Sequence, residues 1–78
     1  MSVTVYGKPG CRPCKSTVAK LEEFEIDFEY VDISQTPEAY ETLKSLGHMQ
    51  APVVVTDMGH WSGYNPDRIQ ALVEPLAA

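Results

Sequence analysis

The sequence predicts an α/β fold in the order β-α-β-α-β-β-α, with four strands in one mixed sheet and three helices. First, a short β-branched run at residues 3–6 leads through a Gly-Pro turn into a helical pattern. Second, Pro37 and Pro66 each follow a capping residue, as at the first position of a helix. Third, a short turn separates the last two strand-like segments. We expect all 78 residues to form one domain.

The first strand and first helix are expected at residues 3–6 and 12–24. Val3 to Tyr6 is too short for a helix and rich in β-branched residues. In the helix, Cys14, Val18 and Leu21 follow at i, i+4 and i+7, so they line one buried face. Cys14 begins that face, whereas Cys11 is expected at the solvent-open start of the first turn.

The second strand is expected at residues 28–32, and the second helix follows it. Thr36 is predicted to cap this helix, with Pro37 at its first position, and Gly47 to end it. Its apolar stripe has helical spacing and consists of Ala39, Leu43 and Leu46.

The C-terminal part is expected to contain two strands and a third helix. Residues 52–56 form a nearly continuous apolar run that predicts a strand buried on both faces. A turn at 57–59 leads to a short strand at 60–61, which makes this pair antiparallel. The helix starts at Asn65-Pro66-Asp67. Ile69, Leu72, Val73 and Leu76 follow at helical spacing, but Pro75 should end the helix early. The crossover between the first two strands predicts parallel pairing. The expected core residues are Val18, Leu21, Leu43, Val53, Val54, Val55, Ile69 and Leu72.

Composition excludes several classes of function. The net charge of −5, without a basic stripe, disfavours binding to nucleic acid. No apolar run approaches the roughly 20 residues of a membrane helix. We also expect no secretory signal, and therefore a cytoplasmic protein. Nothing in the sequence indicates an oligomer, so a monomer is expected.

Cys11-x-x-Cys14, between a strand and a helix, indicates a thiol–disulfide redox site. Free N–H groups and the positive end of the helix dipole stabilise a thiolate at Cys11. Helix N-termini and neighbouring cations bring a cysteine pKa from about 8.5 to roughly 3.5–7.5, and Lys8 and Arg12 are nearby cations in sequence. We therefore predict Cys11 as the attacking thiolate and Cys14 as the resolving thiol, both catalytic.

Other interpretations of the cysteines are a structural disulfide, a zinc site and a copper carrier. Structural disulfides are uncommon in the cytoplasm. Structural zinc needs four ligands, and the spacing of His48 and His60 fits no common zinc finger. The order of elements differs from the β-α-β-β-α-β order of a copper carrier. We therefore expect no metal.

Several motifs together resemble the NrdH-redoxins, which are small glutaredoxin-like proteins of the thioredoxin fold. The matching segments are Tyr6-x-Lys8-Pro9-x-Cys11-x-x-Cys14, Val31-Asp32-Ile33, Gln50-Ala51-Pro52-Val53-Val54 and Trp61-Ser62-Gly63-Tyr64-x-Pro66-Asp67. They extend over nearly the whole chain, and the last of them is the most specific.

The resemblance implies an electron carrier for deoxyribonucleotide synthesis. Such a protein takes electrons from thioredoxin reductase and passes them to a class Ib ribonucleotide reductase. NADPH and FAD belong to the partner reductase, so the chain itself is expected to bind no cofactor beyond its Cys11–Cys14 disulfide. Ala51-Pro52 aligns with a cis peptide bond facing the cysteines. The expected partner-binding residues are Lys8, Arg12, Gln50, Ala51, Pro52, Trp61, Ser62, Gly63 and Tyr64.

The chain also departs from the family pattern. NrdH-redoxins commonly have Val-Gln or Met-Gln between the cysteines, whereas this chain has Arg12-Pro13. A proline immediately before the second cysteine is more like thioredoxin. Tyr64 and Asn65 replace a common Phe and Arg. The alternative functions are a glutathione-dependent glutaredoxin and a general protein disulfide reductase. The former is disfavoured because no obvious cluster of cations could hold the carboxylates of glutathione.

Overall fold

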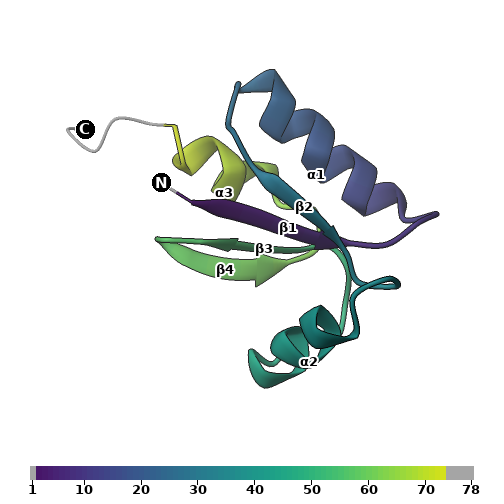
Figure 1. Cartoon of the computed structure of the whole chain (residues 1–78). Helices are drawn as coiled ribbons and strands as arrows, with labels where there is room; N and C mark the ends of the chain where they lie inside the picture. The colour runs from purple at the N-terminus through teal and green to yellow at the C-terminus, as the bar shows by residue number, and fades with distance from the viewer. Residues whose placement is uncertain (1, 74–78) are drawn as a thin grey trace.

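A computed structural model describes residues 2–73 and confirms the predicted fold class (Figure 1). Its four strands are β1 (Val3–Gly7), β2 (Glu29–Asp32), β3 (Val53–Thr56) and β4 (Gly59–Ser62). Its three helices are α1 (Arg12–Glu23), α2 (Pro37–Ser45) and α3 (Pro66–Ala71). The strand order is β2-β1-β3-β4. β1 and β2 pair in parallel, as the crossover predicts, whereas β3 is antiparallel to both β1 and β4.

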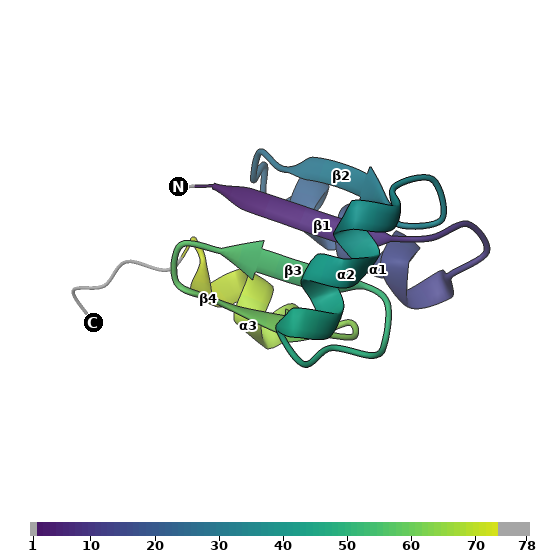
Figure 2. The same ribbon diagram turned by 60° about the horizontal axis from the view of Figure 1, so that its bottom comes forward.

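The helices lie on both faces of the sheet. α1 and α3 cover one face, and α2 lies on the other (Figure 1). In the turned view, α2 crosses in front of the end of β1 and the start of β3 (Figure 2). The loop after β1 and the loop before β3 therefore lie at the same end of the sheet, where α1 begins (Figure 2).

The main core lies between the sheet and the pair α1 and α3. Side chains alternate between the two faces of a strand, so Val5 and its ladder partner Val54 point the same way. The buried cluster on this face consists of Val3, Val5, Leu21, Val54, Trp61 and Ile69. Through Leu21, this cluster packs α1 against the face of the sheet that carries Val3 and Val5 of β1.

Three of the expected core residues are only partly buried: Val18, Val55 and Leu72. On α1 the buried residues are Cys14, Thr17 and Leu21, so the buried face includes the i+3 position that the predicted stripe omits. Helical residues three and four apart both neighbour a given residue, and the packing of α1 favours the one at i+3 here. The predicted burial of Val53 and Val54 on opposite faces of β3 is confirmed.

The second helix has the predicted ends but differs from the prediction in the roles of Thr36 and Leu46. Thr36 occupies the N-cap position, but its side chain makes no capping hydrogen bond. Leu46 is the exposed C-cap residue instead of part of the buried stripe. Gly47 ends the helix as predicted, with a φ of +87° and a hydrogen bond from its N–H to the carbonyl of Lys44.

The other two helices end where the sequence carries weaker signals. Glu25 has a φ of +56° just after α1, and the N–H of Ile26 donates to the carbonyl of Leu21. This is a glycine-type helix end made with a glutamate, which explains why no glycine marks the boundary. α3 ends at Ala71, earlier than expected; Pro75 and Leu76 lie outside the described residues. Within residues 2–73, none of the helices has the length and apolar character needed to span a bilayer.

Candidate redox site

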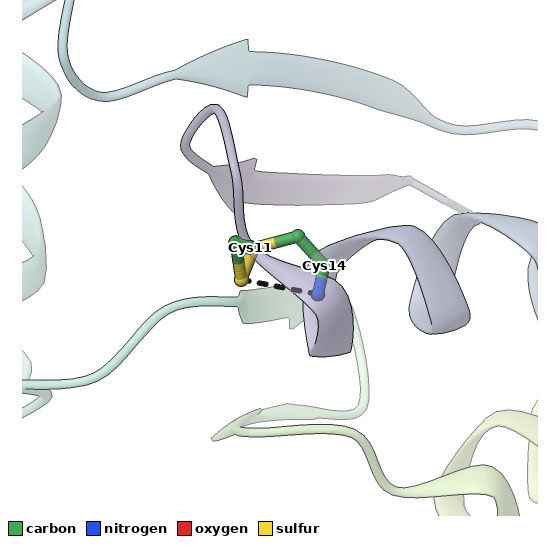
Figure 3. Close-up of a disulfide and its surroundings, with 2 residues drawn as sticks. All are labelled: Cys11 and Cys14. Carbon is green, nitrogen blue, oxygen red and sulfur yellow. Dashed lines mark hydrogen bonds between the residues drawn. A yellow bond between two sulfur atoms is a disulfide. The ribbon is translucent and has the colours of Figure 1, made fainter.

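Cys11 and Cys14 form a disulfide at the N-terminus of α1 (Figure 3). Cys11 is the N-cap residue, with an extended backbone at φ −102° and ψ 107°. The backbone N–H of Cys14 donates to the Sγ of Cys11 over 3.2 Å. The carbonyl of Cys11 accepts from the N–H of Lys15, as the first intrahelical bond requires. The sulfur of Cys11 thus takes the position of a capping oxygen.

Local sequence produces this arrangement. Gly10 has a φ of +71°, which a residue without Cβ adopts easily, and so the loop after β1 can turn into the helix. Pro13 lies in the first turn of α1, where its missing N–H leaves no hydrogen bond unmade. The first turn of α1 contains no acidic residue. No carboxylate within that turn competes with a thiolate for the positive end of the helix dipole.

The two cysteines differ in burial, but less than the sequence suggests. Cys11 is 7% exposed and Cys14 is 2% exposed. The expectation that Cys11 is open to solvent is therefore wrong for the disulfide form, in which the residue is buried. Cys11 is nevertheless the more exposed residue of the two, in the sense that the sequence predicts.

A second segment of the site comes from the start of β3. The Ala51-Pro52 peptide bond is cis, as the resemblance implies, and Pro52 is fully buried. The carbonyl of Pro52 accepts a 2.8 Å hydrogen bond from the N–H of Gly63. This bond joins the loop before β3 to the loop after β4. Gly63 has a φ of +82°, where a side chain would be strained.

Two cavities adjoin these segments. One, of 340 Å³, lies beside α2 and is lined in part by Lys8, Gln50 and Ala51. The other, of 450 Å³, lies between α1 and β2, and its lining includes Lys8 and Cys14. Lys8 therefore lies between the cysteine turn and the segment before Pro52.

The remaining predicted site residues differ in exposure. Trp61 is buried in the core, at 6% exposure, so it acts as a packing residue at least as much as a surface residue. Ser62 and Gly63 are partly exposed, and Arg12, Gln50 and Tyr64 are exposed. The exposed residues are accessible to a partner, whereas Trp61 packs in the core with residues such as Val54 and Ile69.

Three neighbours of the site carry no sequence signal strong enough to predict them. The guanidinium of Arg68 lies 4.9 Å from the centre of the Trp61 ring, a cation–π distance. Tyr30 lines the cavity beside Cys14, and its pKa is raised, first by partial burial and second by the nearby Asp32 carboxylate. Thr17 is fully buried on the same face of α1 as Cys14. Only its spacing of three residues from Cys14 indicates in the sequence that it shares the buried face of the helix.

The two histidines do meet, although the sequence gives no reason to expect it. His48 Nε2 and His60 Nδ1 lie 2.6 Å apart, with their rings nearly perpendicular. This pair connects the loop after α2 to β4. Within the described part of the chain, however, no three His, Cys, Asp or Glu side chains gather as metal ligands would.

The fold and the disulfide define a class of protein that comparison with known families identifies. The family model for glutaredoxin matches residues 3–61. The chain therefore belongs to the glutaredoxin family of thiol–disulfide oxidoreductases.

Within that family, the similarity is to the NrdH group. The chain is 38% identical to the glutaredoxin-like protein NrdH of Escherichia coli over 72 residues, which cover 92% of this chain and 89% of that protein. The structure of NrdH-redoxin from Escherichia coli superposes with a TM-score of 0.90 at 36% identity, covering 96% of this chain and 97% of that one. The gene 56 protein of Mycobacterium phage L5 is 45% identical over 78 residues, covering 97% of this chain and 76% of that protein. The predicted resemblance to NrdH-redoxins is confirmed.

Proposed function

We propose that this protein is a dithiol electron donor to a class Ib ribonucleotide reductase and is itself re-reduced by a thioredoxin reductase. The observation that carries the proposal is a Cys-x-x-Cys disulfide at a helix N-terminus in a chain of the NrdH type. The similar NrdH-redoxin of Escherichia coli is described as having a thioredoxin-like activity profile, which supports a thioredoxin reductase as the source of electrons. NADPH and FAD would belong to that reductase. These partners operate in the cytoplasm, where thiols are kept reduced.

Each turnover would move two electrons by thiol–disulfide exchange. The Cys11 thiolate attacks one sulfur of the target disulfide; the target bond breaks, and the departing sulfur takes a proton from water. Cys14 then loses its proton and attacks Cys11. The Cys11–Cys14 bond forms, and the second target sulfur leaves and is protonated in turn. The target disulfide is reduced to a dithiol, while this protein is oxidised to the disulfide.

The partner would dock on the rim around the cysteines. Lys8 and Arg12 supply positive charge next to Cys11 in a chain whose net charge is −5. Gln50 and Ala51 precede the buried Pro52, and residues 61–64 follow on the neighbouring strand and loop. The Gly63–Pro52 hydrogen bond supports the proposal, because it holds these two parts of the rim side by side.

Two coupled assays test this function. In the first, NADPH oxidation is followed with a thioredoxin reductase, this protein and a class Ib ribonucleotide reductase. In the second, glutathione and glutathione reductase replace the thioredoxin reductase. We expect turnover in the first assay and little in the second. Turnover with glutathione alone would instead support the second candidate, a glutathione-dependent glutaredoxin, which the match to the glutaredoxin family model favours.

A matched measurement separates a dedicated donor from a general protein disulfide reductase. Insulin replaces the ribonucleotide reductase in the first assay, at equal concentration of its disulfides. A dedicated donor is expected to reduce the ribonucleotide reductase much faster than insulin. Equal rates would contradict a dedicated role.

A further inference from the structure

Among residues 2–73, two buried side-chain polar atoms lack a hydrogen-bond partner: the Thr17 hydroxyl and the indole nitrogen of Trp61. The Thr17 side chain is completely buried, at 0% exposure. Leaving a buried hydroxyl unpaired costs stability, so such groups in native proteins usually have a partner or a role. Thr17 is the one that lies on the same helix face as a cysteine of the site.

Another helical threonine shows how unusual this is. In α2, the hydroxyl of Thr42 donates to the carbonyl of Glu38, one turn earlier, over 3.1 Å. Threonine in a helix commonly makes this bond. The equivalent acceptor for Thr17 is the carbonyl of Pro13, yet the Thr17 hydroxyl makes no such bond. The hydroxyl is therefore available for another partner.

Helix geometry directs the Thr17 side chain toward Cys14. The two residues are three apart on the buried face of α1, a spacing that puts their Cβ atoms about 5–6 Å from each other. Helical side chains lean toward the N-terminus and cover the preceding turn. The turn that Thr17 covers is the one that holds Cys14, and no hydrogen bond joins the two side chains while the disulfide is intact.

We propose that Thr17 is a positioning residue of the redox pair, and that its hydroxyl hydrogen-bonds to the sulfur of Cys14 once the disulfide is reduced. Reduction by an external dithiol breaks the Cys11–Cys14 bond. The dithiol gives up two electrons and two protons and becomes a disulfide; the two cysteine sulfurs receive them, and Cys11 then releases its proton to water. The freed Cys14 sulfur moves away from Cys11 and becomes both a donor and an acceptor.

This contact favours one redox state over the other. In the oxidised protein the hydroxyl is unpaired, and in the reduced protein it is paired. The hydrogen bond therefore stabilises the dithiol relative to the disulfide and raises the reduction potential. The inference rests on the redox role of the cysteine pair, but it needs neither of the proposed protein partners.

The test is the equilibrium of the protein with reduced and oxidised dithiothreitol, with the two states separated by thiol alkylation. Thr17→Val removes the hydroxyl and keeps the shape. We expect the equilibrium constant to shift about two- to fivefold toward the disulfide, as for one modest hydrogen bond. This corresponds to a potential roughly 10–20 mV more negative, at about 30 mV per tenfold. The control, Thr42→Val, is expected to leave the potential unchanged.

A second pair of variants separates the hydroxyl from the methyl group. Thr17→Ser and Thr17→Ala both lack the methyl group, but only the serine keeps the hydroxyl. We expect Thr17→Ser to have a potential close to that of the native protein and Thr17→Ala to shift as Thr17→Val does. This pair also decides the question if Thr17→Val does not fold.

Two results would overturn the inference: a native potential in Thr17→Val or Thr17→Ala, or equal shifts in Thr17→Ser and Thr17→Ala. Either would leave the electron-donor proposal standing, because the assay contains no protein partner. Conversely, failure to reduce a ribonucleotide reductase would leave a Thr17-dependent potential intact. The two proposals can therefore fail separately.

Discussion

Helices α1 and α3 begin in the same way, but with different capping atoms. In α1 the N–H of Cys14 donates to the Sγ of Cys11, and in α3 the N–H of Arg68 donates to Oδ1 of Asn65. Both bonds span three residues, and both are 3.2 Å long. The amide oxygen of Asn65 never changes its charge. We expect the sulfur of Cys11 to change from a neutral disulfide sulfur to a thiolate on reduction, and its capping bond would then be charge-assisted.

The first turns of these two helices also differ in whether they contain an acidic residue. Asp67 lies in the first turn of α3, where a carboxylate interacts favourably with the helix dipole. The first turn of α1 has no acidic residue. The positive end of α1 is thus available to a thiolate at Cys11. The comparison teaches that the redox site is itself a helix cap, and we expect the charge of this cap, unlike that of Asn65, to depend on the redox state.

The largest expected effect separates capping from chemistry. Cys11→Ser keeps a good capping atom but removes the nucleophile, so we expect a folded helix and no disulfide reduction. Cys14→Ser keeps the nucleophile and loses the resolving thiol, so the mixed disulfide with the target should accumulate. Insulin reduction and mass spectrometry of the trapped complex measure the two effects. Full reductase activity in Cys11→Ser would contradict the roles of both cysteines.

The second effect concerns the pH dependence of stability in the reduced protein. If the helix end lowers the pKa of the Cys11 thiol, its contribution is present above the ordinary pKa of about 8.5 and is lost as pH falls through the folded-state pKa. Each unit by which folding lowers the pKa of Cys11 contributes about 1.4 kcal/mol to the free energy of unfolding. Urea unfolding of the reduced native protein and of Cys11→Ser, at pH values from 5 to about 9, measures it. Parallel curves for the two proteins would show that Cys11 has an ordinary pKa.

A smaller effect on stability is expected from the loss of the Asn65 cap of α3, whose charge does not change. Asn65→Ala removes the acceptor for the Arg68 N–H and should cost about 1 kcal/mol in the free energy of unfolding. Because no electron transfer changes this cap, the loss should be the same in the oxidised and reduced proteins. Urea unfolding of both forms tests this. A loss that depends on redox state would mean that α3 and the cysteines are coupled.

The smallest effect is expected at Lys8. Its ammonium group is exposed, so water and salt screen its attraction for the Cys11 thiolate. Lys8→Ala should raise the pKa of Cys11 slightly, and less at high ionic strength. The pH dependence of iodoacetamide alkylation of Cys11, in a Cys14→Ser background, measures this. An unchanged alkylation profile at low salt would remove Lys8 from thiolate stabilisation.

The sequence predicts the elements well because their signals are local. Pro37, Pro66 and Gly47 mark helix boundaries through their own backbone preferences, and all three lie where expected. The Cys-x-x-Cys spacing likewise places both sulfurs at one helix end without any distant contact. The parallel and antiparallel pairings of consecutive strands follow from the lengths of their connections.

What the sequence does not predict depends on packing between distant segments. The low exposure of Cys11 is one example, because a place at the start of a helix does not by itself predict burial. The His48–His60 contact and the Arg68–Trp61 contact each need the β3–β4 hairpin in place before the partners meet. The choice of Thr17 over Val18 for the buried face of α1 depends on how the helix rotates against the sheet.

The bond from the Gly63 N–H to the Pro52 carbonyl has a consequence for the local opening of the structure around the site. It joins the loop before β3 and the loop after β4 into a single rim, so a displacement of one loop should be transmitted to the other. The rim should then open only when both loops detach together. Slow deuterium uptake at the Gly63 amide, matched to that of β3, would be the signature of this coupling.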